Sequence, residues 1–219
     1  MSTDAKGRTI WAVVVLTAVS ALACLPAHAQ PRYATSEVLL EGGVAMPEGD
    51  LGSDFHWFEP GETGLGAETG YEVGFRFRYY FSRAMAASGS FHYVDFANFL
   101  GSDELGGFEV ATSILRYAID LNLYLAPERA SIRPFIILGA VLNNNRYRDY
   151  DDYDQSYYKT SIFALGGAGG IGLRMGIFEI SGIYNYNRFE TVRLDPEGLK
   201  REYDWDYIMV QAAFAFPTY

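Results

Sequence analysis

Serine and histidine side chains two residues apart are the first candidates for chemistry in this sequence. His92 follows Ser88 and Ser90, so the three side chains would share one face of a β-strand. A serine beside a histidine can act as an activated nucleophile when an acidic group orients the histidine. These three fall on the same face as charged side chains in neighbouring segments, and no hydrolase motif surrounds them. We therefore expect no catalytic residues, and a structural hydrogen bond for His92.

A run of carboxylates in "DYDDYD" is the second candidate. Carboxylate oxygens at close spacing can bind Ca²⁺, but the glycine and the final glutamate of an EF-hand loop are missing here. Tyrosines interleave with the aspartates, and tyrosine is enriched at protein interfaces. We expect a solvated acidic loop that takes part in surface interactions, with no metal site; calcium binding stays an open alternative. The four aspartates are Asp149, Asp151, Asp152 and Asp154.

A glycine-rich string, "GAGGIG" at residues 167–172, fits the spacing of a dinucleotide-binding loop. That loop needs a strand before it and a helix after it, because the helix N-terminus holds the pyrophosphate. Here the string is followed by another turn and another strand pattern. We therefore expect a glycine-rich strand whose missing side chains make room for large neighbours, and no cofactor.

The overall charge argues against one class of partner. The chain carries 17 basic and 27 acidic residues among 219, and no basic run stands out along the sequence. Nucleic-acid binding requires a Lys/Arg-rich surface. We therefore expect no nucleic acid as a partner.

The first 29 residues have the pattern of an export signal. Lys6 and Arg8 precede an apolar segment at residues 9–25, and small residues at Ala27 and Ala29 fit cleavage after Ala29. The apolar run of about 17 residues is at the lower limit for a permanent membrane helix, the alternative interpretation. Acylation at Cys24 is a second alternative, though "SALAC" matches a lipobox poorly. We expect residues 1–29 to be cleaved and residues 30–219 to form the mature domain.

The rest of the chain has a β period and no convincing helical period. In "YEVGFRFRYYF", residues 71–81, apolar and aromatic residues occupy every second position and two arginines lie between them. Glycine, tyrosine and phenylalanine are abundant, which favours strands and turns. We predict eight strands, at residues 36–46, 71–81, 85–96, 113–125, 133–143, 161–173, 177–187 and 203–216.

The connections between these strands alternate between long and short. They contain about 23, 3, 11, 7, 16, 3 and 16 residues in chain order. Transmembrane up-and-down barrels have long outer loops and short periplasmic turns, whereas a soluble lipocalin-like barrel has no such alternation. Most of the strands also reach the roughly 9–11 residues that a tilted membrane strand needs. We predict an all-β fold, an eight-stranded antiparallel up-and-down transmembrane β-barrel.

This fold assigns the charged side chains to the lumen. If the apolar faces meet lipid, charges of both signs point inward, where they would pair and fill a narrow interior because isolated buried charges are costly. We expect Arg76 and Arg78 to bond Glu72, Asp120 or Glu41. The predicted lumen network contains Glu41, Glu72, Arg76, Arg78, Arg116, Asp120 and Glu179.

Residues 36–216 resemble the small eight-stranded outer-membrane barrels of the OmpA transmembrane-domain and OmpX type. The best local mark is the end of the last strand, which alternates back from an aromatic residue. The resemblance implies that this alternation is the signal read by the barrel-assembly machinery, although the family often ends on the aromatic residue and this chain continues with residues 217–219. The implied signal consists of Ile208, Val210, Ala212, Phe214 and Phe216.

We therefore expect an integral outer-membrane protein of a Gram-negative bacterium, with a structural or surface-interaction role exerted through its outer loops, and not an enzyme. Its expected partners are outer-membrane lipid and lipopolysaccharide, with the barrel-assembly machinery during insertion. Three alternatives stay open. They are a small-solute or ion channel resembling the OmpW type, a lipid-modifying enzyme, and a soluble periplasmic or secreted barrel.

Overall fold

The computed structural model describes residues 36–53, 64–97, 99–102, 107–151, 156–191, 194 and 200–218. The expected signal segment with its cleavage site, Asp152 and Asp154 lie outside these residues. No helix in the described part of the chain is long and apolar enough to cross a membrane.

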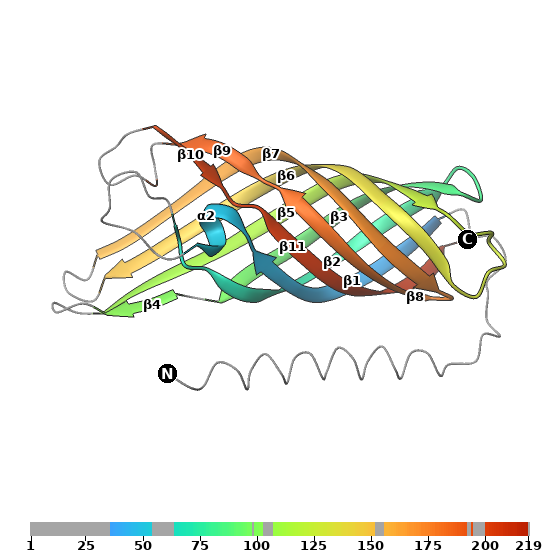
Figure 1. The fold of residues 1–219 in the computed structure, drawn as a ribbon, viewed down its shortest axis with the longest axis horizontal. Helices are drawn as coiled ribbons and strands as arrows, with labels where there is room; N and C mark the ends of the chain where they lie inside the picture. The colour runs from blue at the N-terminus through green and yellow to red at the C-terminus, as the bar shows by residue number, and fades with distance from the viewer. Residues whose placement is uncertain are drawn as a thin grey trace. The chain divides into compact units, whose positions relative to one another are not determined.

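Eight long strands form one closed sheet in which every neighbouring pair is antiparallel (Figure 1). Strands adjacent in the chain are adjacent in the sheet, and the first and last strands pair to close it. The predicted eight-stranded up-and-down barrel is therefore confirmed. Its strands are β1 (Ser36–Pro47), β2 (Glu68–Tyr80), β3 (Met85–Ala97), β5 (Gly107–Tyr124), β6 (Arg133–Asp151), β7 (Ser156–Met175), β8 (Phe178–Tyr186) and β11 (Tyr207–Thr218).

The register of the strands fixes the width and tilt of the barrel. Starting at Ser36 and stepping through paired residues around all eight strands, the path returns to β1 at Met46, ten residues further along. With strand spacings of roughly 3.3 Å per residue and 4.8 Å between strands, this stagger corresponds to a tilt of about 40°. An eight-stranded barrel of this kind has an interior that side chains can fill.

The two faces of β2 show which side chains point out of the barrel and which point into its lumen. Phe75 and Phe77 point outward and are about half exposed, whereas Arg76 and Arg78 point inward and are almost completely buried. Alternate side chains of a strand lie on opposite faces, so the whole sheet follows the same rule. The barrel therefore has an apolar outer wall, and its interior buries charged side chains together with apolar ones, unlike the core of a soluble protein.

Three strands, β5, β6 and β7, extend several residues further toward the long-loop end, on the left of Figure 1, than the sequence predicted, whereas β8 and β11 are shorter there. β6 continues to Asp151 and β7 begins at Ser156, so Asp149 and Asp151 belong to a strand and not to the predicted loop. Paired tyrosines, Tyr150 opposite Tyr157, continue the ladder there, and tyrosine favours strands. β5 likewise begins at Gly107, several residues before its predicted start.

The remaining long connections contain short elements that the sequence analysis did not predict. β4 (Phe99–Ser102) pairs with β5, and β9 (Arg188–Thr191) pairs with β10 (Arg201–Asp204) in a separate hairpin. The single helical turn α2 (Gly49–Gly52) follows β1. The long-loop end is thus built largely of ordered β structure in the described part of the chain.

The glycine-rich string at residues 167–172 lies inside β7, as predicted. Gly172 faces the lumen, where a Cβ atom would approach the ring of Phe135 to 2.3 Å. The glycine therefore makes room for a large interior side chain of the neighbouring strand. At the turn into β8, Gly176 has a φ of 65°, a conformation that glycine adopts without a steric cost.

Candidate functional site

All seven residues of the predicted lumen network lie on the inner wall and are buried. They come from four strands: β1, β2, β5 and β8. Because the strands are tilted and staggered, these seven residues lie at different heights along the barrel axis. They take part in two groups, one near the short turns and one in the middle.

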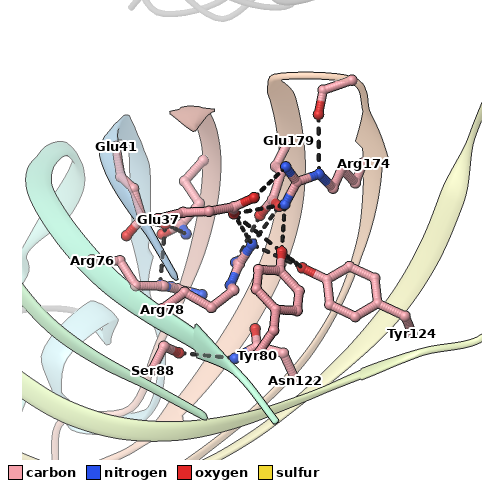
Figure 2. Close-up of polar contacts among 12 residues, drawn as sticks. Glu37, Glu41, Arg76, Arg78, Tyr80, Ser88, Asn122, Tyr124, Arg174 and Glu179 are labelled. Carbon is pink, nitrogen blue, oxygen red and sulfur yellow. Dashed lines mark hydrogen bonds and ion pairs between the residues drawn. The ribbon is translucent and has the colours of Figure 1, made fainter. Parts of the chain in front are cut away.

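Four charged side chains meet near the short-turn end, and we name them the four-charge cluster: Glu37, Arg78, Arg174 and Glu179 (Figure 2). Arg78 donates two hydrogen bonds to the Glu179 carboxylate, at 2.5 and 2.8 Å. Arg174 donates two to Glu37, at 2.7 and 2.6 Å, and a third to Glu179 at 3.2 Å. Two positive charges thus face two negative charges in a buried, bidentate arrangement, the strongest geometry for such pairs.

Two tyrosines complete this end of the lumen. Tyr124 accepts a hydrogen bond from Arg78 at 2.8 Å, and Tyr80 accepts one from Arg174 at 2.5 Å. The two rings stack with centroids 5.8 Å apart, and their hydroxyl groups lie 2.9 Å from one another. Charged groups and rings together fill the interior at this level.

The middle of the lumen is organised around Glu41 and His92. Glu41 pairs with Arg76 at 3.2 Å, and His92 Nε2 lies 2.6 Å from the Glu41 carboxylate. Arg116 donates to His92 Nδ1 at 3.3 Å, so the network assigns the ring proton to Nε2, which donates to Glu41. The hydrogen bond expected for His92 is present.

The serines beside His92 form hydrogen bonds with other side chains. Ser90 accepts a hydrogen bond from Arg116 at 3.1 Å, and Ser88 accepts one from Asn122 at 2.8 Å. Within the described residues, no hydrogen bond joins either serine to His92. A hydrolytic site would need that contact as well as access to substrate, and His92 is fully buried.

Four other charged groups in the middle have buried atoms without a protein hydrogen-bond partner among the described residues. Both carboxylate oxygens of Glu72 and of Asp120 are in this state, as is one terminal nitrogen each of Arg76 and Arg116. The contact between Arg116 and Asp120 is long, at 3.8 Å. Buried charged atoms without partners are strongly disfavoured, and solvent in the middle of the barrel would supply the missing hydrogen bonds.

The partners of the arginines differ in part from expectation. Arg76 pairs with Glu41, one of its expected partners, whereas Arg78 pairs with Glu179 and lies 3.6 Å from Glu37. Glu37 and Arg174 were not predicted from the sequence. Glu37 is four residues before Glu41 on the same strand, so the alternation of faces already places both side chains on the inner wall. Arg174 was assigned to a turn because the predicted strand ended at residue 173, whereas β7 ends at Met175.

Aromatic rings fill the lumen at the long-loop end. Phe189 packs edge-on against Trp205 at 5.2 Å, and Phe96 against Tyr207 at 5.9 Å. Below them Asn145 and Asn187 exchange side-chain hydrogen bonds at 2.8 and 3.2 Å. Close side-chain contacts therefore line the described interior at both ends.

The remaining predicted residues lie outside the lumen or at its upper edge. The five residues of the implied assembly signal alternate along the outer wall of β11. The strand continues past Phe216, with Thr218 paired to Ser36, so the signal does not end the strand. Of the four aspartates, only the Asp149 side chain is described, and it is half-buried near the end of β6.

The closed barrel is shared with small outer-membrane proteins of known structure. Neisserial surface protein A aligns with a TM-score of 0.55 and 11% identity, over 84% of this chain and 98% of that chain. The attachment invasion locus protein Ail of Yersinia pestis aligns with a TM-score of 0.51 and 13% identity, over 84% and 100%. No protein-family model and no curated protein matches the sequence. The resemblance to small eight-stranded outer-membrane barrels is thus confirmed at the level of the fold.

Proposed function

We propose that this chain is an integral outer-membrane protein that uses its barrel as a closed anchor and its long-loop end as a surface for interactions outside the cell. The observation that carries the proposal is the apolar outer wall. Ile119, Leu165 and Ile171 are exposed by 74%, 80% and 71% around the barrel. Soluble monomers rarely expose a continuous apolar surface of this extent, and lipid would cover it.

Aromatic side chains mark both edges of this wall. Tyr71, Tyr184 and Tyr186 are exposed toward the long-loop edge, and Phe81 and Phe216 toward the short-turn edge. Membrane barrels carry such aromatic girdles where the sheet meets the two lipid interfaces. The wall between the girdles is the part that we assign to the hydrocarbon core, with outer-membrane lipid and lipopolysaccharide as its surroundings.

The side-chain contacts inside the barrel favour the anchor function and argue against an open pore. The four-charge cluster and its two tyrosines block the short-turn end, and the aromatic rings block the other. Eight strands leave space for side chains and not for a wide channel. A small-ion channel is the second candidate, because solvent in the middle would hydrogen-bond to the charged atoms there.

The long-loop end supplies the surface for recognition. β6 and β7 stay paired as far as Asp151 and Ser156, well beyond the tyrosine girdle. An ordered, paired sheet holds side chains in fixed positions, which lowers the entropy cost of binding. We place the contact with an extracellular partner on this projecting part of the sheet.

Cell fractionation tests the proposal. We expect the protein in the outer-membrane fraction, with a faster-moving band on SDS gels before boiling than after it. Planar-bilayer recording of the purified barrel distinguishes the two candidates, since an anchor shows no steady conductance. Recovery in the soluble fraction would refute the membrane assignment, and a steady conductance would favour the channel.

A further inference from the structure

Three basic side chains gather on the outer wall of the β6–β7 hairpin. Arg146 and Arg148 lie on β6, and Lys159 lies on β7 directly opposite Arg148. Arg148 and Lys159 are exposed and Arg146 is half-buried. We name these three residues the basic ladder; it stands out in a chain of net charge −10.

The basic ladder lies directly above an apolar strip on the same two strands. Leu142 pairs with Leu165 and Asn144 pairs with Phe163, and the next outward-facing pair brings in Arg146. Leu165 and Phe163 are exposed by 80% and 64%. The outer wall thus changes from apolar to cationic within four residues along each strand.

The position of the ladder matches the headgroup layer of a membrane. Arg146 is four residues beyond Leu142 on a strand tilted by about 40°, which places it roughly 10 Å higher along the barrel axis. Headgroups occupy several Å on each side of the hydrocarbon core. The strip therefore faces acyl chains and the ladder faces headgroups.

The excess positive charge of the basic ladder favours the binding of an anion. Like charges directly opposite one another on paired strands destabilise a sheet, and Arg148 faces Lys159 in this way. In the described part of the chain, none of the three cations forms an ion pair. Asp95 lies on β3, with β5 between it and the ladder, and its carboxylate accepts a hydrogen bond from Tyr93 at 3.0 Å.

We propose that the basic ladder and the apolar strip form a binding site for a phosphorylated lipid of the outer leaflet, in which the acyl chains lie along Leu142, Phe163 and Leu165 and the phosphates contact the three cations. The site rests on the proposed membrane location and names the lipid partner at the level of residues. Its occupant is a lipid and not free phosphate, because the strip adjoins the ladder.

The test uses the full, folded barrel in phosphatidylcholine nanodiscs that contain either bisphosphorylated lipid A or lipid A without phosphates. Native mass spectrometry counts the bound lipid. Wild type should retain the bisphosphorylated form preferentially, and Arg146→Gln, Arg148→Gln and Lys159→Gln should each reduce its affinity about fivefold, as expected for one cation near a membrane surface. The triple variant should lose the preference entirely.

The matched control carries Arg83→Gln and Arg129→Gln, two exposed cations of the short turns, and should bind like wild type. Millimolar inorganic phosphate should not displace the lipid. Equal retention of both lipid A forms by wild type, an unaffected triple variant, or displacement by phosphate would each overturn the site. The gel-shift and fractionation assays report separately on the membrane location, so a protein that is folded in the outer membrane but shows no lipid preference contradicts only this inference.

Discussion

Removal of the Arg78 guanidinium is the most direct perturbation of the lumen. Arg78 is fully buried and makes a bidentate contact with Glu179, with nitrogen–oxygen distances of 2.5 and 2.8 Å. In Arg78→Ala, the four-charge cluster would hold one positive and two negative charges. The Glu179 carboxylate would keep only its 3.2 Å contact with Arg174.

The expected cost follows from the burial of this pair. Removing one partner of a buried ion pair costs about 3–5 kcal/mol of unfolding free energy, because the other charge stays buried without compensation. Replacing both partners, as in Arg78→Met with Glu179→Gln, restores neutrality and should cost less than the sum of the two single changes. We expect a coupling energy of about 2 kcal/mol or more, within the range measured for residues in direct contact.

Urea unfolding of the barrel in lipid vesicles, followed by tryptophan fluorescence, measures these energies. The control is Arg83→Ala, whose side chain is 85% exposed and lies 3.7 Å from Glu128. An exposed pair of this kind contributes less than about 1 kcal/mol. If Arg78→Ala costs no more than Arg83→Ala, or if the two buried changes are additive, the cluster does not stabilise the lumen and the reasoning fails.

Three further predictions test the wall, the assembly signal and the orientation. Gly172→Ala should destabilise the barrel by about 1–3 kcal/mol in the same unfolding assay, because the added Cβ would overlap an interior phenylalanine ring. The control Gly182→Ala should leave the unfolding free energy unchanged, because the space around Gly182 is open. Phe216→Ala should lower the amount of protein in the outer membrane several-fold while the purified barrel still folds in vitro; equal amounts of both proteins in cells would contradict an assembly role. A charged maleimide added to intact cells should label Lys159→Cys but not Arg83→Cys, whose position lies on an exposed short turn, and the reverse result would exclude this orientation.

The sequence was sufficient to predict which wall the named lumen charges and the side chains of β2 occupy. Alternation in β2 separates Phe75 and Phe77 from Arg76 and Arg78, and the same parity holds for every interior charge named from the sequence. The reason is physical, since a strand has a side-chain period of two regardless of its surroundings. Eight such segments, joined by alternating long and short loops, are the pattern of a closed antiparallel membrane barrel.

The partners across the lumen could not be predicted in the same way. They depend on the stagger of ten residues around the barrel, which no local pattern encodes. That stagger brings Glu179 of β8 to Arg78 of β2, although the two are 101 positions apart. The register of the β6–β7 hairpin places Lys159 beside Arg148, so a basic site forms in a sequence that contains no basic run.

The strand ends near the long loops were wrong for a different reason. Residues 143–151 are polar and tyrosine-rich, a composition that also suits a surface loop. Lipid no longer selects apolar side chains there, so hydrophobic alternation disappears even though backbone pairing continues from Asn143 to Asp151. In a membrane barrel, loss of the apolar pattern thus marks the edge of the membrane and not the end of the strand.

The interior explains why an anchor and a channel are close alternatives for one fold. Solvent in the middle of the barrel would hydrogen-bond to Glu72 and Asp120, so the middle would not be the barrier to ion movement. The barrier lies at the two ends, where the four-charge cluster is internally neutral and the rings around Trp205 are apolar. A cluster whose positive and negative charges cancel attracts a passing ion only weakly, and an apolar constriction disfavours the entry of an ion. We therefore expect the proposed anchor role to hold as long as both ends stay packed, and we expect the chemistry of those ends, not the strand number, to separate the two candidate functions.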